Sequence, residues 1–191
     1  CERDILADVV DLTYMGGANA QKLRMARERA LLLGGGPNIQ YGSANDPATA
    51  NLQPVLWCLK AWSDGSVGVL PWQVIGSAEK LSTGVPTGLF MPAPNGKGVV
   101  PSVRVKAFRH GQQDVEYLTL LADVLGSRQF AVAETVRKRI DLSGKLHKTS
   151  EADAGALDFD KAGPVELWRL RMAVGSAVSA KHPPYRRCVQ P

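Results

Sequence analysis

Residues 101–126 read PSVRVKAFRHGQQDVEYLTLLADVLG and carry the clearest structural pattern of the chain. Apolar residues recur in this stretch mostly at spacings of three, four or seven, the period of one helix face; they are Val105, Phe108, Val115, Leu118, Leu121, Ala122 and Leu125. Ser102 suits the N-cap position, and Gly126 suits the residue after the last turn, because glycine tolerates a left-handed backbone. The pattern predicts a helix between these two residues with its apolar stripe on a core.

Gly111 lies inside this predicted helix, where glycine costs about 1 kcal/mol relative to alanine. We therefore expect a close backbone approach or a bend at this residue. Polar residues surround it in the sequence: Arg104, Arg109, Gln113, Asp114 and Glu116. Taken alone, such a set is typical of a salt-bridged or solvated helix face rather than of a catalytic site.

The same string resembles a signature near the end of the catalytic barrel of glycoside hydrolase family 123 and its largely uncharacterised relatives. That signature reads Pro-Ser-Ile-Arg-Leu, then Arg-Asp-Gly, then Asp-Tyr-Glu-Tyr-Leu. The matching residues are Pro101, Ser102, Arg104, Arg109, Gly111, Asp114, Glu116, Tyr117 and Leu118. His110 stands where the family has aspartate, and Val115 where it has an aromatic residue. The resemblance extends over roughly residues 8–125 and implies the final βα units of the family's barrel.

Composition excludes several classes of protein. The chain has 191 residues, 45% of them hydrophobic, which is ordinary for a globular domain. Its net charge is +5, but acidic residues interrupt the basic ones, so we expect no nucleic-acid partner. It has no apolar run of about 18 residues, so we expect no membrane span. Its three cysteines and three histidines lack metal-ligand spacing, so we expect no metal and no other cofactor.

The cysteines also bear on the compartment. Cys1 and Cys188 can pair with each other or with a partner outside the chain, whereas Cys58 falls in a predicted helix and is expected to be buried. An extracellular or periplasmic location is therefore favoured. Because the chain begins with Cys1 rather than methionine, we interpret it as processed or as a piece of a longer polypeptide.

Strand-like and helical segments alternate along the first part of the chain. They are a strand at 8–15, a helix at 20–33, a strand at 38–42, a helix at 47–62, a strand at 66–75 and a short strand at 87–91. Pro54 argues for a later helix start, near Asn51, and Pro71 argues that the strand ladder stops near Leu70. After the helix at 101–126 we expect a shorter helix at 130–140, a poorly ordered stretch at 141–160 and a last helix from Pro164.

This alternation predicts an α/β fold with parallel strands under helices. A complete (β/α)8 TIM-type barrel needs eight units and about 250 residues, so the chain is too short for one. We expect the carboxy-terminal half of such a barrel, with an open parallel α/β sheet as the alternative. Residues 1–126 would form the last βα units, and residues 127–191 would form helices and a basic tail that pack on the barrel.

An isolated half barrel would expose two strand edges and an apolar interior. We therefore predict that the missing half exists, as an upstream segment or as a separate chain.

Active sites of parallel barrels lie at the carboxyl ends of the strands. The candidate substrate-binding residues there are Tyr14, Tyr41, Asn45, Trp72 and Gln73. Trp72 is the best sugar platform among them, because an indole face packs on the apolar face of a pyranose. Alternatively, Trp72 is a core aromatic residue that closes the end of the barrel. Trp57 and Trp62 lie in a predicted helix, and we assign them to the core.

The resemblance implies substrate-assisted hydrolysis of N-acetyl-β-galactosaminides by an adjacent Asp-Glu pair. No Asp-Glu dipeptide occurs in this sequence. We expect that pair upstream of these residues, so the catalytic residues are unknown and the chain by itself is expected to be inactive. We therefore predict that the chain is part of a glycoside hydrolase-like barrel and that it supplies walls that bind a carbohydrate substrate.

Two other functions stay open. The first is a non-catalytic carbohydrate-binding or structural barrel in a larger assembly. The second is a basic open-sheet domain that binds a nucleotide or nucleic acid, which would need a clustered basic face.

Overall fold

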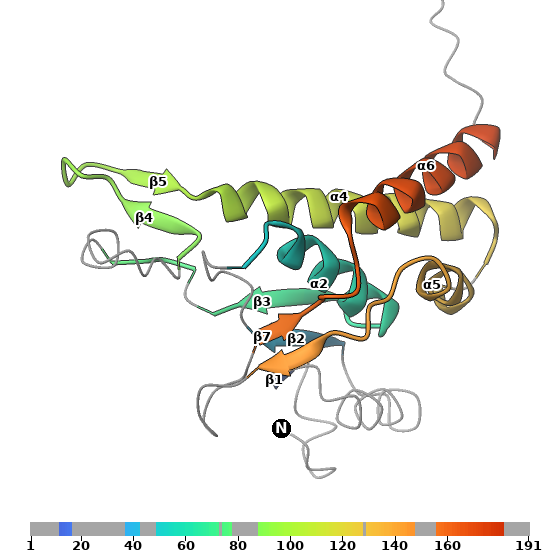
Figure 1. Cartoon of the computed structure of the whole chain (residues 1–191), viewed down its shortest axis with the longest axis horizontal. Helices are drawn as coiled ribbons and strands as arrows, with labels where there is room; N and C mark the ends of the chain where they lie inside the picture. Colours follow the sequence, from blue (N-terminus) through green and yellow to red (C-terminus); the bar gives the residue numbers. More distant parts are fainter. Residues whose placement is uncertain are drawn as a thin grey trace, which may run out of the picture.

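The computed structural model describes residues 12–16, 37–42, 49–72, 74–77, 88–127, 129–147 and 156–181. The expected helix at 20–33 and most of the expected strand at 8–15 lie outside these residues. Within them the chain has a mixed α/β fold with short parallel and antiparallel sheets (Figure 1). The α/β class predicted from the sequence is therefore confirmed.

A three-stranded parallel sheet has the order β1-β2-β3. Its strands are β1 (Thr13–Gly16), β2 (Asn38–Gly42) and β3 (Gly68–Pro71). Tyr14 lies opposite Ile39, and Tyr41 lies opposite Leu70. The ladder ends at Pro71, one residue beyond the expected stop, and the Trp72 amide then donates to the Gly42 carbonyl over 2.7 Å.

After this point the chain changes its strand partner. Ile75 forms a parallel bridge with Phe90, and the Gly76 amide donates to the Phe90 carbonyl over 2.8 Å. Phe90 opens β4 (Phe90–Pro92), which pairs with β5 (Val99–Pro101) in an antiparallel hairpin. Parallel pairing thus joins β1, β2 and β3, and one isolated bridge links the segment after β3 to β4.

The β4–β5 hairpin adds a second strand to the short strand predicted at 87–91. Two glycines with positive φ, Gly96 (69°) and Gly98 (89°), turn the chain between the strands. Only the first strand, near residues 87–91, was predicted, because the proline and glycine residues of the turn look like a loop in the sequence. The hairpin projects away from the sheet beside the start of the helix that follows it (Figure 1).

Helix α2 (Leu52–Ser63) is the centre of the fold. Asn51 is its N-cap residue, so the later start that Pro54 suggested is confirmed. Nearly every residue of the helix is buried, because it lies between the parallel sheet and α4 (Val103–Val124) (Figure 1). A helix that is apolar all round needs such cover on both sides.

Helix α4 has the predicted ends. Ser102 is its N-cap residue, although the Ser102 hydroxyl is buried and makes no capping hydrogen bond to the described residues. At the other end Gly126 has φ 58°, the Gly126 amide donates to Asp123 O over 3.0 Å, and the Ser127 amide donates to Ala122 O over 2.9 Å. This is the Schellman arrangement, which satisfies carbonyls of the last turn.

The carboxy-terminal part packs on α2 and α4. It consists of α5 (Gln129–Arg137), a hairpin of β6 (Lys145–His147) and β7 (Ala156–Asp158), and α6 (Pro164–Lys181). The hairpin corrects the expectation of a poorly ordered stretch at 141–160, since Leu157 and Phe159 are buried in the core. One hydrophobic cluster joins α2, α4, α5 and α6, and the division at residue 126 stays a prediction.

Leu167, Leu170 and Val174 of α6 pack in the hydrophobic cluster, whereas Val165, Trp168 and Met172 are exposed. None of the helices within the described ranges is long and apolar enough to cross a membrane.

Candidate functional site

The carboxyl ends of β2 and β3 bring two of the predicted residues together. Strand alternation turns Gln40 toward α2, where Trp57 Nε1 donates to Gln40 Oε1 over 3.2 Å. The next residue, Tyr41, therefore faces the other side of the sheet. Its ring meets Trp72 edge to face, with centroids 5.8 Å apart and planes at 87°.

Trp72 is 53% exposed, which is inconsistent with a tryptophan sealed in a core within the described part of the chain. The two tryptophans that were assigned to the core behave as predicted. Trp57 and Trp62 are buried, and their indole N–H groups donate to Gln40 and to Thr119 Oγ1. The Tyr41–Trp72 pair is therefore the aromatic surface available at these strand ends.

Aliphatic and aromatic side chains continue from this pair across the sheet surface that faces away from α2. Tyr14 on β1 is exposed and lies opposite Ile39, and Leu70 on β3 is exposed and lies opposite Tyr41. We call Tyr14, Ile39, Tyr41 and Leu70 the open sheet face. Of the five predicted substrate-binding residues, Asn45 and Gln73 lie outside the described residues.

Arg104 is the signature residue that contacts the chain after β2. Its side chain is buried, with 5% exposure. Its guanidinium donates to the carbonyl of Ala50 over 2.9 Å and to the carbonyl of Thr49. These carbonyls belong to the segment that leads from β2 into α2, so Arg104 fixes the connection that follows the carboxyl end of a strand.

Gly111 and Asp114 hold α4 against its neighbours. A Cβ at Gly111 would lie 2.9 Å from Cys58 Cβ and Sγ and 3.1 Å from Val55 Cα, so the close backbone approach predicted for this glycine is confirmed. Asp114 accepts two hydrogen bonds of 2.7 Å from Nε and Nη2 of Arg171 on α6. Burial, together with the nearby Asp114 charge, raises the pKa of the Cys58 thiol to about 12.

Three of the signature residues point outward. Arg109, Glu116 and Tyr117 are exposed on the surface of α4. The matched string therefore combines residues that fix the helix, namely Ser102, Arg104, Gly111 and Asp114, with residues that face solvent.

A polar network under the sheet was missed by the sequence analysis. Gln40 Nε2 donates to Asp64 Oδ2 over 3.1 Å, and Asp64 also pairs with Lys60 at 2.6 Å and with Arg137 at 3.5 Å. Gln40 is almost fully buried, and a glutamine between Ile39 and Tyr41 in an apolar strand was the available signal. The network lies at the end of α2 away from its N-terminus, so it supports the fold and not the strand-end site.

A second contact missed by the sequence analysis ties the β6–β7 hairpin to the start of α2. Gln53 Nε2 donates to Asp158 Oδ1 over 3.2 Å, and Gln53 Oε1 accepts from the Phe159 amide over 2.9 Å. The start of α2 lies on the side of the carboxyl ends, since a helix that follows a parallel strand begins there. The hairpin thus adds a carboxylate near that side of the molecule.

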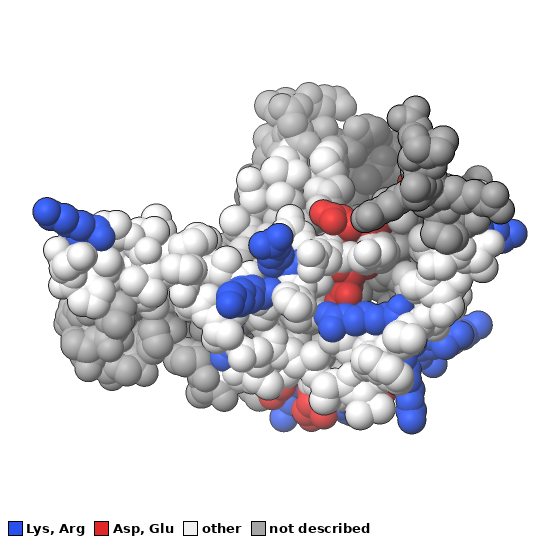
Figure 2. Space-filling model, turned by 90° about the horizontal axis from the view of Figure 1, so that it is seen from above, with Lys and Arg blue, Asp and Glu red and all other residues white. Residues whose placement is uncertain are grey.

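Charged side chains are scattered over the surface formed by α4 and α6. Figure 2 shows basic and acidic side chains separated by uncharged ones on this face, with a hollow near its middle. The described residues hold no group of three or more His, Cys, Asp or Glu side chains placed to bind a metal ion.

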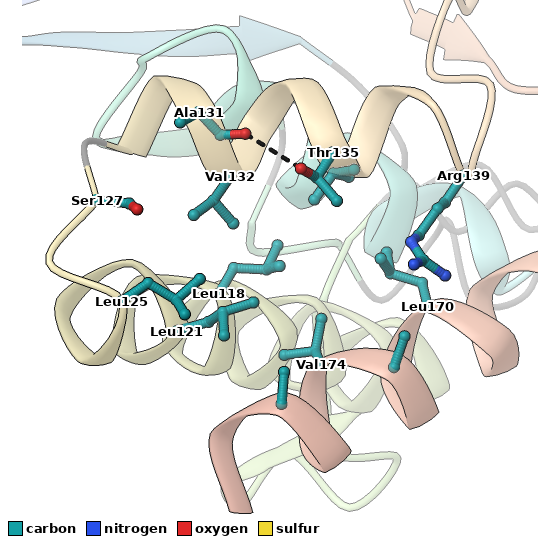
Figure 3. Close-up of a pocket in the computed structure, with 13 residues that line it drawn as sticks. Leu118, Leu121, Leu125, Ser127, Ala131, Val132, Thr135, Arg139, Leu170 and Val174 are labelled. Carbon is teal, nitrogen blue, oxygen red and sulfur yellow. Dashed lines mark hydrogen bonds between the residues drawn. The ribbon is translucent and has the colours of Figure 1, made fainter. Parts of the chain in front are cut away.

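Two cavities lie between packed elements, and the second of them reaches Pro71 at the carboxyl end of β3. One, of about 310 Å³, lies between α4, α5 and α6. Leu118, Leu121, Val132 and Val174 point toward one another in it, while Arg139 reaches its edge (Figure 3). The other, of about 570 Å³, lies between β3, α2 and α4 and includes Trp62 and Phe108. Neither cavity includes Tyr41 or Trp72.

No protein-family model and no curated protein matches the chain. Among solved structures it is similar to a family 123 glycoside hydrolase from Clostridium perfringens, described for glycolipid glycan hydrolysis, with 14% identity and a TM-score of 0.51. The alignment covers 90% of this chain and 32% of the hydrolase, so the chain spans about a third of that enzyme's length. At this identity the likeness concerns the fold alone.

Proposed function

We propose that this chain is the carboxy-terminal part of a glycosidase-like (β/α)8 barrel and supplies part of its sugar-binding wall. Tyr14, Tyr41 and Trp72 form that wall, together with Asn45 and Gln73 from the connections after the same strands. The proposed substrate is a carbohydrate with a glycosidic bond. The resemblance of residues 101–118 to the family 123 signature points to an N-acetylhexosaminide.

The order of the strands is compatible with a barrel. In a doubly wound sheet the strand order reverses at a switch point. The described parallel strands keep the order β1-β2-β3 without such a reversal, and α2 covers one face of this sheet (Figure 1). The other face carries apolar side chains, as the interior of a barrel does. The similarity to a family 123 hydrolase agrees with this arrangement.

The Tyr41–Trp72 pair is the observation that carries the proposal. It lies at the carboxyl ends of β2 and β3, where parallel barrels place their sites. An edge-to-face contact fixes the indole orientation while half of the Trp72 surface stays accessible. A rigid exposed indole packs on the C–H face of a pyranose and excludes water from it.

The acid and base that hydrolysis needs are expected outside these residues. Glycoside hydrolysis needs a proton donor for the leaving oxygen and a group that stabilises the oxocarbenium-like transition state. The described strand ends supply aromatic walls for the sugar, and the preceding βα units would supply the carboxylates. Those units would also cover the open sheet face.

Sugar binding by variants tests the wall. Trp72→Ala should weaken binding of an N-acetylhexosaminide by about tenfold, because the stacking surface is lost. The matched control is Trp168→Ala, which removes an exposed tryptophan from α6. Titration followed by nuclear magnetic resonance measures both affinities. Equal affinities for Trp72→Ala and the native chain would refute the role of Trp72.

Hydrolysis by the native particle separates the enzyme from a non-catalytic barrel. An aryl N-acetylhexosaminide should release its phenol in the presence of the native material, and Trp72→Ala should slow that release. Binding that depends on Trp72 without any release would instead establish the carbohydrate-binding alternative.

A further inference from the structure

The cavity of about 310 Å³ between α4, α5 and α6 is an apolar groove (Figure 3). Helix α5 lies on one side of it, and α4 and α6 lie on the other (Figure 3). The three leucines of α4 that line it are Leu118, Leu121 and Leu125. Three alanines of α5 and α6 line it as well, namely Ala131, Ala173 and Ala177. Because these alanine side chains are short, the space between α5 and α6 stays open.

Arg139 gives this groove a positive charge at one end. It lies two residues after the end of α5, at the end of the groove opposite Leu125 (Figure 3). Of the described residues that line the groove, Arg139 alone is charged, and its guanidinium makes no hydrogen bond or ion pair with another described residue. The neighbouring Arg137, by contrast, pairs with Glu134 and Asp64. The groove therefore presents one uncompensated cation.

The size and lining of the groove decide what kind of ligand it fits. A helix is about 10 Å across and does not fit in this volume, which is at the lower end of the range for small-molecule sites. A sugar fits poorly as well, because its hydroxyl groups need polar partners. Besides Arg139, the described lining offers only the hydroxyls of Ser127 and Thr135, and the Thr135 hydroxyl donates to Ala131 O over 3.2 Å.

A ligand that is aliphatic along its length and anionic at one end matches both features. Methylene groups leave water when they pack on leucine, valine and alanine side chains. A carboxylate accepts two parallel hydrogen bonds from a guanidinium, so it is the anionic group that suits Arg139 best. A cation would be repelled by Arg139, and a neutral alkyl chain would leave its charge without a partner.

We propose that this groove binds a fatty acid of medium chain length. The carboxylate accepts hydrogen bonds from Arg139, and the alkyl chain runs past Val132 and Val174 toward Leu125. From Ala131 to Arg139 the chain advances about 12 Å at the helical rise, which suits an extended alkyl chain of about ten carbon atoms. This site is separate from the Tyr41–Trp72 pair and does not depend on sugar binding there.

Two variants test the two halves of the ligand separately. Arg139→Gln removes the cation at an exposed position, so the variant should stay folded. Its matched control is Lys138→Gln, which removes an exposed cation that does not line the groove. Ala177→Leu fills the groove with a larger apolar side chain. Its matched control is Ala180→Leu, the same exchange at an exposed position of α6 outside the groove.

The experiment is a titration of the 191-residue chain, with any polypeptide that copurifies with it, followed by nuclear magnetic resonance. The probe is decanoate below the concentration at which it forms micelles. Decanol is the probe without the charge, and acetate is the probe without the alkyl chain. The methyl groups of Val132 and Val174 and the Arg139 side-chain N–H report the groove, whereas the Trp72 indole N–H reports the strand ends.

We expect the groove signals to move with decanoate, about tenfold more weakly with decanol, and not with acetate. In Arg139→Gln the affinity for decanoate should fall about tenfold, to that for decanol, while the affinity for decanol stays the same. Ala177→Leu should weaken both ligands. Lys138→Gln and Ala180→Leu should bind both ligands as the native chain does.

Three results would overturn the proposal. The first is that the groove signals do not respond to decanoate, whether or not the Trp72 signal moves. The second is that folded Arg139→Gln keeps the native preference for decanoate over decanol. The third is that a copurifying polypeptide shields the methyl groups of Val132 and Val174, since the groove would then be a protein interface. Each of these results leaves the proposed sugar-binding wall untouched.

Discussion

Gly111 and Gly175 show how the same residue type serves opposite purposes in two helices. At Gly111 a Cβ would come within 2.9 Å of Cys58, and close to the backbone of Val55, so α4 could not approach α2 as it does. At Gly175 the corresponding position is open. Comparing these two glycines separates the intrinsic helix preference of the residue type from the effect of packing against a neighbouring helix.

Alanine at these two positions should therefore change stability in opposite directions. Gly111→Ala should lower the free energy of unfolding by about 1–3 kcal/mol, the usual cost of overpacking a core. Gly175→Ala should raise it by up to about 1 kcal/mol, because alanine is the better helix former and nothing obstructs its methyl group. Urea denaturation of both variants measures the two changes. A stabilised Gly111→Ala would show that the two helices do not approach as described.

Because of Cys58, the free energy of unfolding should depend on pH in the alkaline range. Burial and, to a smaller extent, the charge of Asp114 raise the pKa of its thiol from 9.0 to about 12. Between these values the unfolded chain loses the proton while the folded chain keeps it, so the free energy of unfolding falls as the pH rises. Well below pH 9 the thiol is protonated in both states, and its contribution to stability is constant.

Cys58→Ala should remove this part of the pH dependence. Thermal denaturation of the native chain and of the variant between pH 8 and about 11 should give curves whose difference changes mainly above pH 9. The native thiol should also resist alkylation until the chain unfolds. Rapid alkylation of the folded chain would contradict the burial of Cys58.

Single residues also show where sequence reasoning ends. A glycine inside the helical pattern of residues 101–126 indicated a close approach, and the structure shows one. The partner of Arg104 was not predictable, since its acceptor carbonyls lie 54 and 55 residues away and carry no side-chain signature. The same holds for Asp114, whose partner Arg171 lies 57 residues further along the chain.

At the scale of elements, Arg104 joins α4 to the start of α2. A buried guanidinium that donates to two carbonyls is held by charge-assisted hydrogen bonds. Without it, those carbonyls lose these two hydrogen bonds, and the connection after β2 loses its anchor.

Arg104→Met should thus lower the free energy of unfolding by about 2 kcal/mol, within the range for hydrogen bonds to a charged group. Arg109→Met is the control on the same helix, because Arg109 is exposed, and it should change stability by no more than about 0.5 kcal/mol. Chemical denaturation of the two variants decides the matter. Equal losses would mean that the buried contacts of Arg104 contribute nothing specific.

The ends of α2 and α4 were predictable because local chemistry sets them. Pro54 in the first turn of α2, and Gly126 after α4, act within a few residues of the boundary. Strands β5, β6 and β7 were not predictable. Each has three residues, too few to show an alternating pattern, and each exists because a hairpin partner completes its hydrogen bonds.

The candidate site was predictable in part. Strand order and the rule for parallel barrels placed Tyr41 and Trp72 at neighbouring strand ends, and the structure brings their rings to 5.8 Å. The sequence did not reveal Asp158 near the start of α2, because its approach depends on the β6–β7 hairpin. The roles of Tyr14, Tyr41, Asn45, Trp72 and Gln73 in sugar binding stay predictions.

At the scale of the whole molecule, α2 covers one face of the parallel sheet with a nearly complete apolar surface. The opposite face carries Tyr14 and Leu70, which are exposed, and Ile39 and Tyr41, which are partly buried. Exposed apolar side chains gathered on one face are typical of a surface that another part of a protein covers. A set of preceding βα units would close the barrel over it.

The intact mass of the native material tests this account most directly, measured first under native conditions and then after denaturation. We predict that the native particle is heavier than a single chain of these 191 residues. Its additional mass would consist of further βα units, either on the same polypeptide or on a second one that dissociates on denaturation. A monomer of the 191 residues alone that unfolds cooperatively would contradict the half-barrel, and an open α/β sheet would take its place.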